Sequence, residues 1–177
     1  MMNDIEKILI TEEELKEGVA RLGKQIAEEY ADKNPVFIGI LKGVVVYFAD
    51  MIRATQIPCE IDFMVVSSYG KGTSFGTLLM KKDVSVDIRG RHVVILEDIL
   101  DTGRTLSHVI DHLKAKEPAS LKICTLLNKP TRREVDIEAD YIGFTIPNEF
   151  VVGYGLDYAE RYRNLPFVGV LKPEIYS

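Results

Sequence analysis

The chain has 177 residues, 46% of them hydrophobic and 28% charged, which is ordinary for one globular domain with a full core. Its formal net charge of −5 at pH 7 argues against a general nucleic-acid binder, which would carry a basic face. The two cysteines lack zinc-site or disulfide spacing, and the apolar stretches fit neither a signal peptide nor a membrane span, so we expect a cytoplasmic protein.

The predicted elements alternate between helices and strands. A capping box at Thr11 to Glu14 begins a helix of about five turns. Two more helices are predicted, at 44–54 and from the Thr102–Thr105 turn to about 116. Strands are predicted at 36–41, 61–66, 78–81, 93–96, 121–127, 141–144, 151–154 and 168–171. This alternation predicts an α/β fold in which helices flank a mostly parallel central sheet.

Residues 93–106 are the most informative segment. Four apolar residues lead into Glu97 and Asp98, then Asp101, a Thr-Gly-Arg-Thr turn and the apolar face of a helix. Such a loop lies beyond the carboxyl end of a strand, where open α/β sheets bind ligands. The helix N-terminus favours a phosphate, Gly103 permits close backbone approach, and the carboxylates suit sugar hydroxyls or a hard cation.

Two readings of these acids stay open from the residues alone. Asp101 is either a general base or a cap of the following helix. Glu97 and Asp98 are adjacent, and adjacent strand residues point to opposite faces, so we expect the strand to end before them if both reach one ligand. Asp101-Thr102-Gly103 is also the triplet of aspartic proteases, but the helix pattern directly after it argues against that all-β class.

Residues 97–105, Glu-Asp-Ile-Leu-Asp-Thr-Gly-Arg-Thr, resemble the phosphoribosyl-pyrophosphate signature of the type I phosphoribosyltransferases. Other segments are similar to the 6-oxopurine branch of that family and occur in its order: Leu41-Lys42-Gly43, 67–70, Asn128-Lys129-Pro130, and 148–158 with Arg163. The resemblance implies one domain over 1–177, with a core at about 10–139 and a small hood subdomain mainly from about 140–177 and the N-terminus.

The resemblance also implies an activity in purine salvage. The 5-phosphoribosyl group of phosphoribosyl pyrophosphate would pass to hypoxanthine or guanine, giving IMP or GMP and pyrophosphate. Mg²⁺ is the implied cofactor, and a homodimer or homotetramer is expected, with neither a nucleic-acid nor a membrane partner. Two alternatives remain: a xanthine-preferring phosphoribosyltransferase and a non-catalytic regulator that binds phosphoribosyl pyrophosphate.

Site residues follow by matching positions. Asp101 is the candidate general base. The expected phosphoribosyl and 5′-phosphate site contains Glu97, Asp98, Asp101, Thr102, Gly103, Arg104 and Thr105. The expected pyrophosphate site contains Lys42, Gly43, Ser68, Tyr69 and Arg163, with a cis Leu41–Lys42 peptide. The expected purine site contains Lys129, Phe150, Val151 and Asp157, and the expected metal ligands are Glu97, Asp98 and Asp157.

Three of these positions also have ordinary structural readings. Lys42 could simply extend into solvent at the end of its strand. Phe150 could be a core aromatic residue. The glycine-rich segment that follows Ser68 and Tyr69 suits a lid that closes during catalysis, but it equally suits a plain hairpin loop.

Overall fold

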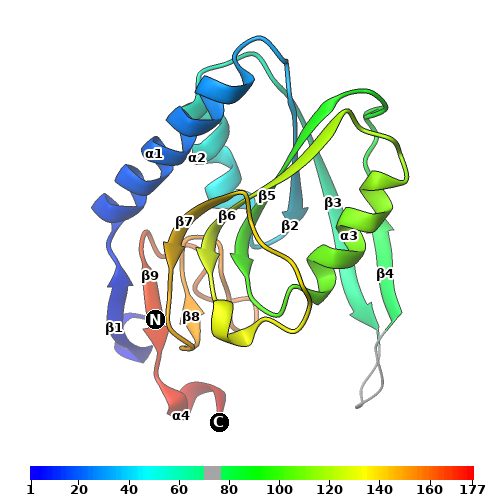
Figure 1. Cartoon of the computed structure of the whole chain (residues 1–177). Coiled ribbons are helices and arrows are strands. Elements are labelled where there is room, and N and C mark those ends of the chain that lie inside the picture. Colours follow the sequence, from blue (N-terminus) through cyan, green and yellow to red (C-terminus); the bar gives the residue numbers. More distant parts are fainter. Residues whose placement is uncertain (70–76) are drawn as a thin grey trace.

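The computed structural model describes residues 1–69 and 77–177, and the glycines of the predicted lid at 70–76 lie outside them. The chain forms a six-stranded sheet with helices on both faces and a three-stranded sheet beside it (Figure 1). The α/β fold with a mostly parallel central sheet is therefore confirmed.

The large sheet has the strand order β4-β3-β2-β5-β6-β7. All neighbours pair in parallel except β4, which runs antiparallel to β3 at one edge. The strands are β2 (Val36–Leu41), β3 (Glu60–Tyr69), β4 (Thr77–Lys82), β5 (His92–Leu100), β6 (Ser120–Asn128) and β7 (Tyr141–Thr145). The carboxyl ends of β2, β5 and β6 consequently meet at one edge of the sheet.

Successive residues of the central strands contribute to two separate hydrophobic cores, one on each face of the sheet. Phe37 and Val94 face α1 (Glu12–Tyr30) and α2 (Val45–Thr55), whereas Ile38 and Ile95 face α3 (Arg104–Lys114). Successive strand residues point to opposite faces, so a buried parallel strand is apolar on both sides. The predicted capping box at the start of α1 is present. Across the described residues, no helix is both long and apolar enough to cross a bilayer.

The central strand is longer than predicted. β5 continues beyond Leu96 to Leu100 because Glu97 and Ile99 still pair with Thr125 and Leu127 of β6. The expectation that the strand ends before the acidic pair is thus wrong.

Beyond the large sheet, three short strands form an antiparallel sheet in the order β1-β9-β8. They are β1 (Ile5–Ile10), β9 (Val168–Leu171) and β8 (Val151–Val152). The short helix α4 (Pro173–Tyr176) follows β9, and the 3₁₀ turns are η1 (Met2–Asp4) and η2 (Pro130–Arg132). Between residue 140 and β8 the chain first adds β7 to the large sheet, where it pairs with β6. β8 is shorter than predicted because Gly153 and Tyr154 have positive φ angles of 97° and 51°.

Asp62 ties β3 to the segment that follows β4. Its carboxylate accepts hydrogen bonds from the backbone nitrogens of Phe63 (2.7 Å), Ser85 (2.5 Å) and Val86 (2.9 Å) and from Lys82 Nζ (3.1 Å). Burial alone would raise the pKa of Asp62, but these hydrogen bonds together lower it below its usual value. The charged carboxylate therefore stabilises the fold.

We expect Asp62→Asn to reduce the free energy of unfolding at pH 7 by about 1–3 kcal/mol, because an amide cannot accept all these hydrogen bonds. Since the folded-state pKa lies below the unfolded value of about 3.9, this contribution is complete above that pH. It is lost as the pH falls through the folded-state pKa, so wild type and variant should converge in acid. Urea unfolding across this pH range measures the difference, with the exposed Asp87→Asn as control; a difference independent of pH would contradict the assignment.

Candidate active site

A cavity of about 240 Å³ lies at the carboxyl end of β5, between that strand and α3. Six of the seven predicted phosphoribosyl residues line it: Glu97, Asp98, Asp101, Thr102, Gly103 and Thr105. Arg104 is the exception, because its guanidinium pairs with Glu134. One polar pocket thus borders both carboxylates and the start of a helix.

The first turn of α3 borders this cavity, and its Arg104 N donates to Thr102 Oγ1 at 3.4 Å. Gly103 is the N-cap residue and has no side chain with which to cap the helix. The first intrahelical bond runs from Ser107 N to Gly103 O at 2.8 Å. The preceding N–H groups have no carbonyl partner inside the helix, and the helix dipole favours an anion there. This geometry fits a phosphate.

Gly103 is required for a reason beyond the one predicted. Its φ of 81° is unfavourable for residues with a side chain. A Cβ atom there would lie 2.6 Å from Ile137 Cγ2 and 2.9 Å from Val135 Cγ2. The glycine therefore allows the turn to pack against residues 135–137, a role in addition to the predicted close approach of a ligand.

Glu97 and Asp98 line the same cavity although both belong to β5. The Asp98 carboxylate accepts a hydrogen bond from the backbone N–H of the next residue, Ile99, at 2.8 Å. Burial raises the pKa of both carboxyl groups, and the neighbouring Asp98 charge raises the pKa of Glu97 further. A divalent cation would offset this loss of hydration and this repulsion, so the pair suits a hard metal ion.

Asp157, the third predicted metal ligand, has other partners. Its carboxylate lies 3.0 Å from Arg163 Nη2 and accepts a hydrogen bond from Glu160 N at 2.9 Å. Within residues 1–69 and 77–177, no three His, Cys, Asp or Glu side chains gather closely enough to hold a metal by themselves. A metal in this cavity would need ligand or water oxygens as well, which is the usual situation for Mg²⁺.

Asp101 does not cap α3. Its carboxylate lies 3.1 Å from Arg132 Nε and remains partly exposed at the edge of the cavity. Arg133 supports the same loop from below, donating to Asp101 O at 3.2 Å and to Asn128 Oδ1 at 2.6 Å. The sequence analysis did not predict a role for either arginine, because Asp101 lies about thirty residues away in sequence. The adjacent arginines shortly after Pro130 were the available signal.

Residues 41–43 carry the expected cis Leu41–Lys42 peptide. The Lys42 side chain extends into solvent, in agreement with its ordinary structural reading, and its Nζ lies 3.2 Å from Glu160 Oε1. Gly43 packs directly on the acidic pair, since a Cβ atom there would lie 1.9 Å from Asp98 Oδ2. A Cβ atom on Gly155 would lie 2.0 Å from Gly43 O.

Arg163 lies in the loop between β8 and β9 and contacts three other residues of that loop. Its Nη1 donates to Gly155 O at 2.7 Å, and its Nη2 contacts Asp157 and, at 3.4 Å, Glu160. Arg163 Nε is buried and has no hydrogen-bond partner among the described atoms. Lys42 and Arg163 thus share Glu160 as a partner, which the sequence analysis had not identified as a site residue. The side chains of Ser68 and Tyr69 lie outside the described part.

The loop at 153–163 has an unusual backbone. Tyr154, Ala159, Glu160 and Tyr162 all have positive φ angles, between 50° and 77°. Such conformations cost energy in residues with a side chain and persist where the surrounding contacts enforce them. The loop therefore holds Arg163 and its acidic partners in a defined arrangement.

Lys129 directly follows β6, and Phe150 directly precedes β8. Lys129 N donates to Leu100 O at 2.9 Å, which places Lys129 beside the end of β5. Its side chain is buried, Nζ donates to Glu149 O at 2.6 Å, and burial lowers the pKa of the amine. Phe150 is 38% exposed, so the reading as a core aromatic is wrong, whereas Val151 is buried in β8.

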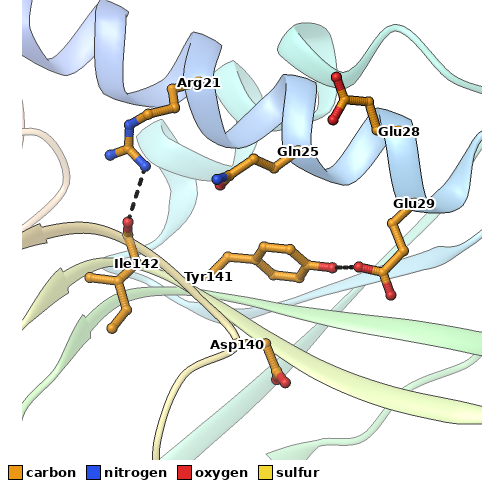
Figure 2. Close-up of a pocket in the computed structure, with 7 residues that line it drawn as sticks. All are labelled: Arg21, Gln25, Glu28, Glu29, Asp140, Tyr141 and Ile142. Carbon is orange, nitrogen blue, oxygen red and sulfur yellow. Dashed lines mark hydrogen bonds between the residues drawn. The ribbon is translucent and has the colours of Figure 1, made fainter.

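A cavity of about 550 Å³ between α1 and β7 does not belong to this site (Figure 2). Arg21 reaches across it to Ile142 O at 3.4 Å, and the Tyr141 hydroxyl donates to Glu29. Tyr141 begins β7, so the cavity lies at the amino end of that strand, opposite the edge where α/β sheets bind ligands. Its polar groups fasten α1 to the edge strand.

Comparisons with known proteins agree with this geometry. Residues 7–159 match the model of the phosphoribosyl transferase domain. A hypoxanthine-guanine phosphoribosyltransferase of Streptococcus pneumoniae is 55% identical over 99% of this chain and 98% of its own length. A bifunctional protein TilS/HprT of Listeria monocytogenes is 53% identical over the whole chain, which spans only 28% of that protein.

Among solved structures, a hypoxanthine phosphoribosyltransferase of Staphylococcus aureus superimposes with a TM-score of 0.96 at 48% identity, over 100% of this chain and 97% of the other. The matched region contains β5, the acidic pair, the turn and α3. The chain belongs to the phosphoribosyl transferase family.

Proposed function

We propose that the protein transfers the 5-phosphoribosyl group of phosphoribosyl pyrophosphate to hypoxanthine or guanine, forming IMP or GMP and pyrophosphate in purine salvage. The observation that carries this proposal is the shared cavity at the end of β5, which borders both the N-terminus of α3 and the carboxylates of half-buried Glu97 and buried Asp98. The first half suits a 5′-phosphate and the second suits the ribose hydroxyls. A homodimer or homotetramer stays a prediction.

In this proposal, Glu97 and Asp98 accept hydrogen bonds from the ribose hydroxyls and hold Mg²⁺. When bound, Mg²⁺ neutralises charge on the pyrophosphate and ribose oxygens. Thr102 to Thr105 hold the 5′-phosphate through backbone N–H groups and hydroxyls. Lys42, Gly43 and Arg163 take the pyrophosphate, for which Arg163 Nε is an available buried donor. These contacts fix the anomeric carbon for attack by the purine nitrogen.

Asp101 accepts the proton that the purine imidazole ring loses during this attack. Its carboxylate is at the edge of the cavity, and Arg132 orients it. Lys129 donates to the 6-oxo group, and this role is supported by the bond from Lys129 N to Leu100 O, the residue before Asp101. Phe150 stacks on the purine ring and the Val151 backbone contacts the ring edge. Asp157 completes this purine site.

The activity itself is tested by incubating the protein with phosphoribosyl pyrophosphate and hypoxanthine, guanine, xanthine, adenine or uracil in turn. We expect IMP and GMP as the main products. Adenine should react little because its 6-amino group offers Lys129 no acceptor, and uracil should react little because it lacks the imidazole ring that attacks the anomeric carbon. Removing Mg²⁺ with a chelator should abolish turnover, and adding Mg²⁺ back should restore it. Faster reaction with xanthine, or binding without turnover, would support one of the alternatives.

Asp101→Asn should lower turnover roughly 10²-fold, the typical contribution of a general base, while IMP binding stays within a few-fold of wild type. The amide keeps the size of the carboxylate but cannot take the proton. Steady-state kinetics and IMP titration separate the two effects, and Asp111→Asn, an exposed position on α3, is the matched control. Turnover near wild type would rule out Asp101 as the base.

Lys129→Gln should lower kcat/KM for hypoxanthine about 10- to 100-fold, because a charged hydrogen bond to the 6-oxo group is lost. Discrimination against adenine should also weaken, since the amide oxygen can accept from the 6-amino group. The ratio of kcat/KM values for the two bases measures this, with exposed Lys114→Gln as control. An unchanged ratio would place the 6-oxo contact elsewhere.

A further inference from the structure

Three aromatic side chains from separate segments meet at the start of β8. Phe150 and Tyr176 stack, with ring centroids 4.7 Å apart and ring planes inclined by 21°. Tyr158 meets Phe150 edge-on, at 5.7 Å and 87°, and lies 6.4 Å from Tyr176. Offset stacked and edge-to-face arrangements are the favoured geometries of aromatic pairs. The three rings therefore form one packed unit.

Phe150 still exposes 38% of its surface, although Tyr176 covers one of its faces and Tyr158 blocks an edge. The exposed part of the Phe150 ring is therefore the part that neither of these two rings covers. Tyr176 is 37% exposed as well, so this pair is not part of a buried core. Buried Lys129 donates to Glu149 O, the carbonyl of the residue before Phe150. An exposed aromatic ring next to this contact in sequence is suited to a planar heterocycle.

Tyr176 is held in place by the same strands that present Phe150. Leu171 N donates to Phe150 O at 2.9 Å, which joins the end of β9 to the residue before β8. The turn of α4 follows, with Ile175 N donating to Lys172 O at 3.0 Å. Ile175 packs against the small-sheet core. The position of the Tyr176 ring is thus coupled to that of Phe150.

We propose that Tyr176 is a positioning residue of the purine site, which fixes the Phe150 ring from behind so that its exposed part is ready for the base. This inference rests on the proposed function and deepens it, because it assigns to α4 a part in purine recognition. An exposed phenylalanine without this support would lose side-chain freedom when the base binds, which weakens binding. The support should change purine affinity about 2- to 10-fold.

The test compares Tyr176→Ala, Tyr176→Leu and Tyr176→Phe in steady-state kinetics, with hypoxanthine and phosphoribosyl pyrophosphate varied separately. Ala and Leu both lack a flat ring, so each should raise the KM for hypoxanthine several-fold. The KM for phosphoribosyl pyrophosphate and kcat should stay within about two-fold of wild type. Phe keeps the ring and should behave like wild type. Glu174→Ala, an exposed change in α4, controls for disturbance of that turn.

Several results would overturn the proposal. A lower KM for hypoxanthine in Tyr176→Ala would mean that Tyr176 covers the face that the purine uses. Wild-type behaviour of Tyr176→Leu would mean that apolar bulk suffices, and an equal rise in both KM values would indicate a general structural effect. If the wild type acts on neither purine, the proposed function fails and this inference fails with it. If only the Tyr176 variants are without effect, this inference alone fails.

Discussion

The close contact between the Gly43 backbone and the Asp98 carboxylate is the constraint on which the site depends. It brings the end of β2 against β5, and Gly155 then packs on Gly43 O from the loop between β8 and β9. Three segments that are distant in sequence meet here only because two of the positions have no side chain. A methyl group at either glycine would overlap with its neighbour and push the segments apart.

Charge is compensated locally in this protein, whose net charge is −5. Arg132 holds Asp101, Arg163 holds Asp157, and Glu160 bridges the cations Lys42 and Arg163. In β5, burial raises the pKa of both Glu97 and Asp98, although the charge of Arg163 acts in the opposite direction on Asp98. A bound polyanion would compete with the acidic side chains for the cations. The metal bound with it would reduce the charge repulsion and the cost of burial in the acidic pair of β5.

Sequence patterns predicted the alternation of elements well, because helix and strand periodicities are local properties. They were wrong about the end of β5, since two adjacent carboxylates look like the end of a buried strand, whereas pairing with Thr125 and Leu127 continues the ladder. The roles of Arg133 and Glu160 were missed for a related reason. Arg133 reaches Asp101 and Glu160 reaches Lys42 across 32 and 118 residues of sequence, and no local pattern encodes such a pair.

The sequence alone determined the fold class, the position of the phosphate-type turn and the residues that resemble a phosphoribosyltransferase, because these depend on residue order over short spans. Only the tertiary structure decided that Gly103 is needed for packing against Val135 and Ile137, that Asp101 faces Arg132 and does not cap α3, and that Tyr176 lies against Phe150. The physical reason is that these contacts arise when parallel pairing brings strand ends together, and contact distances across a fold cannot be read from neighbours along the chain.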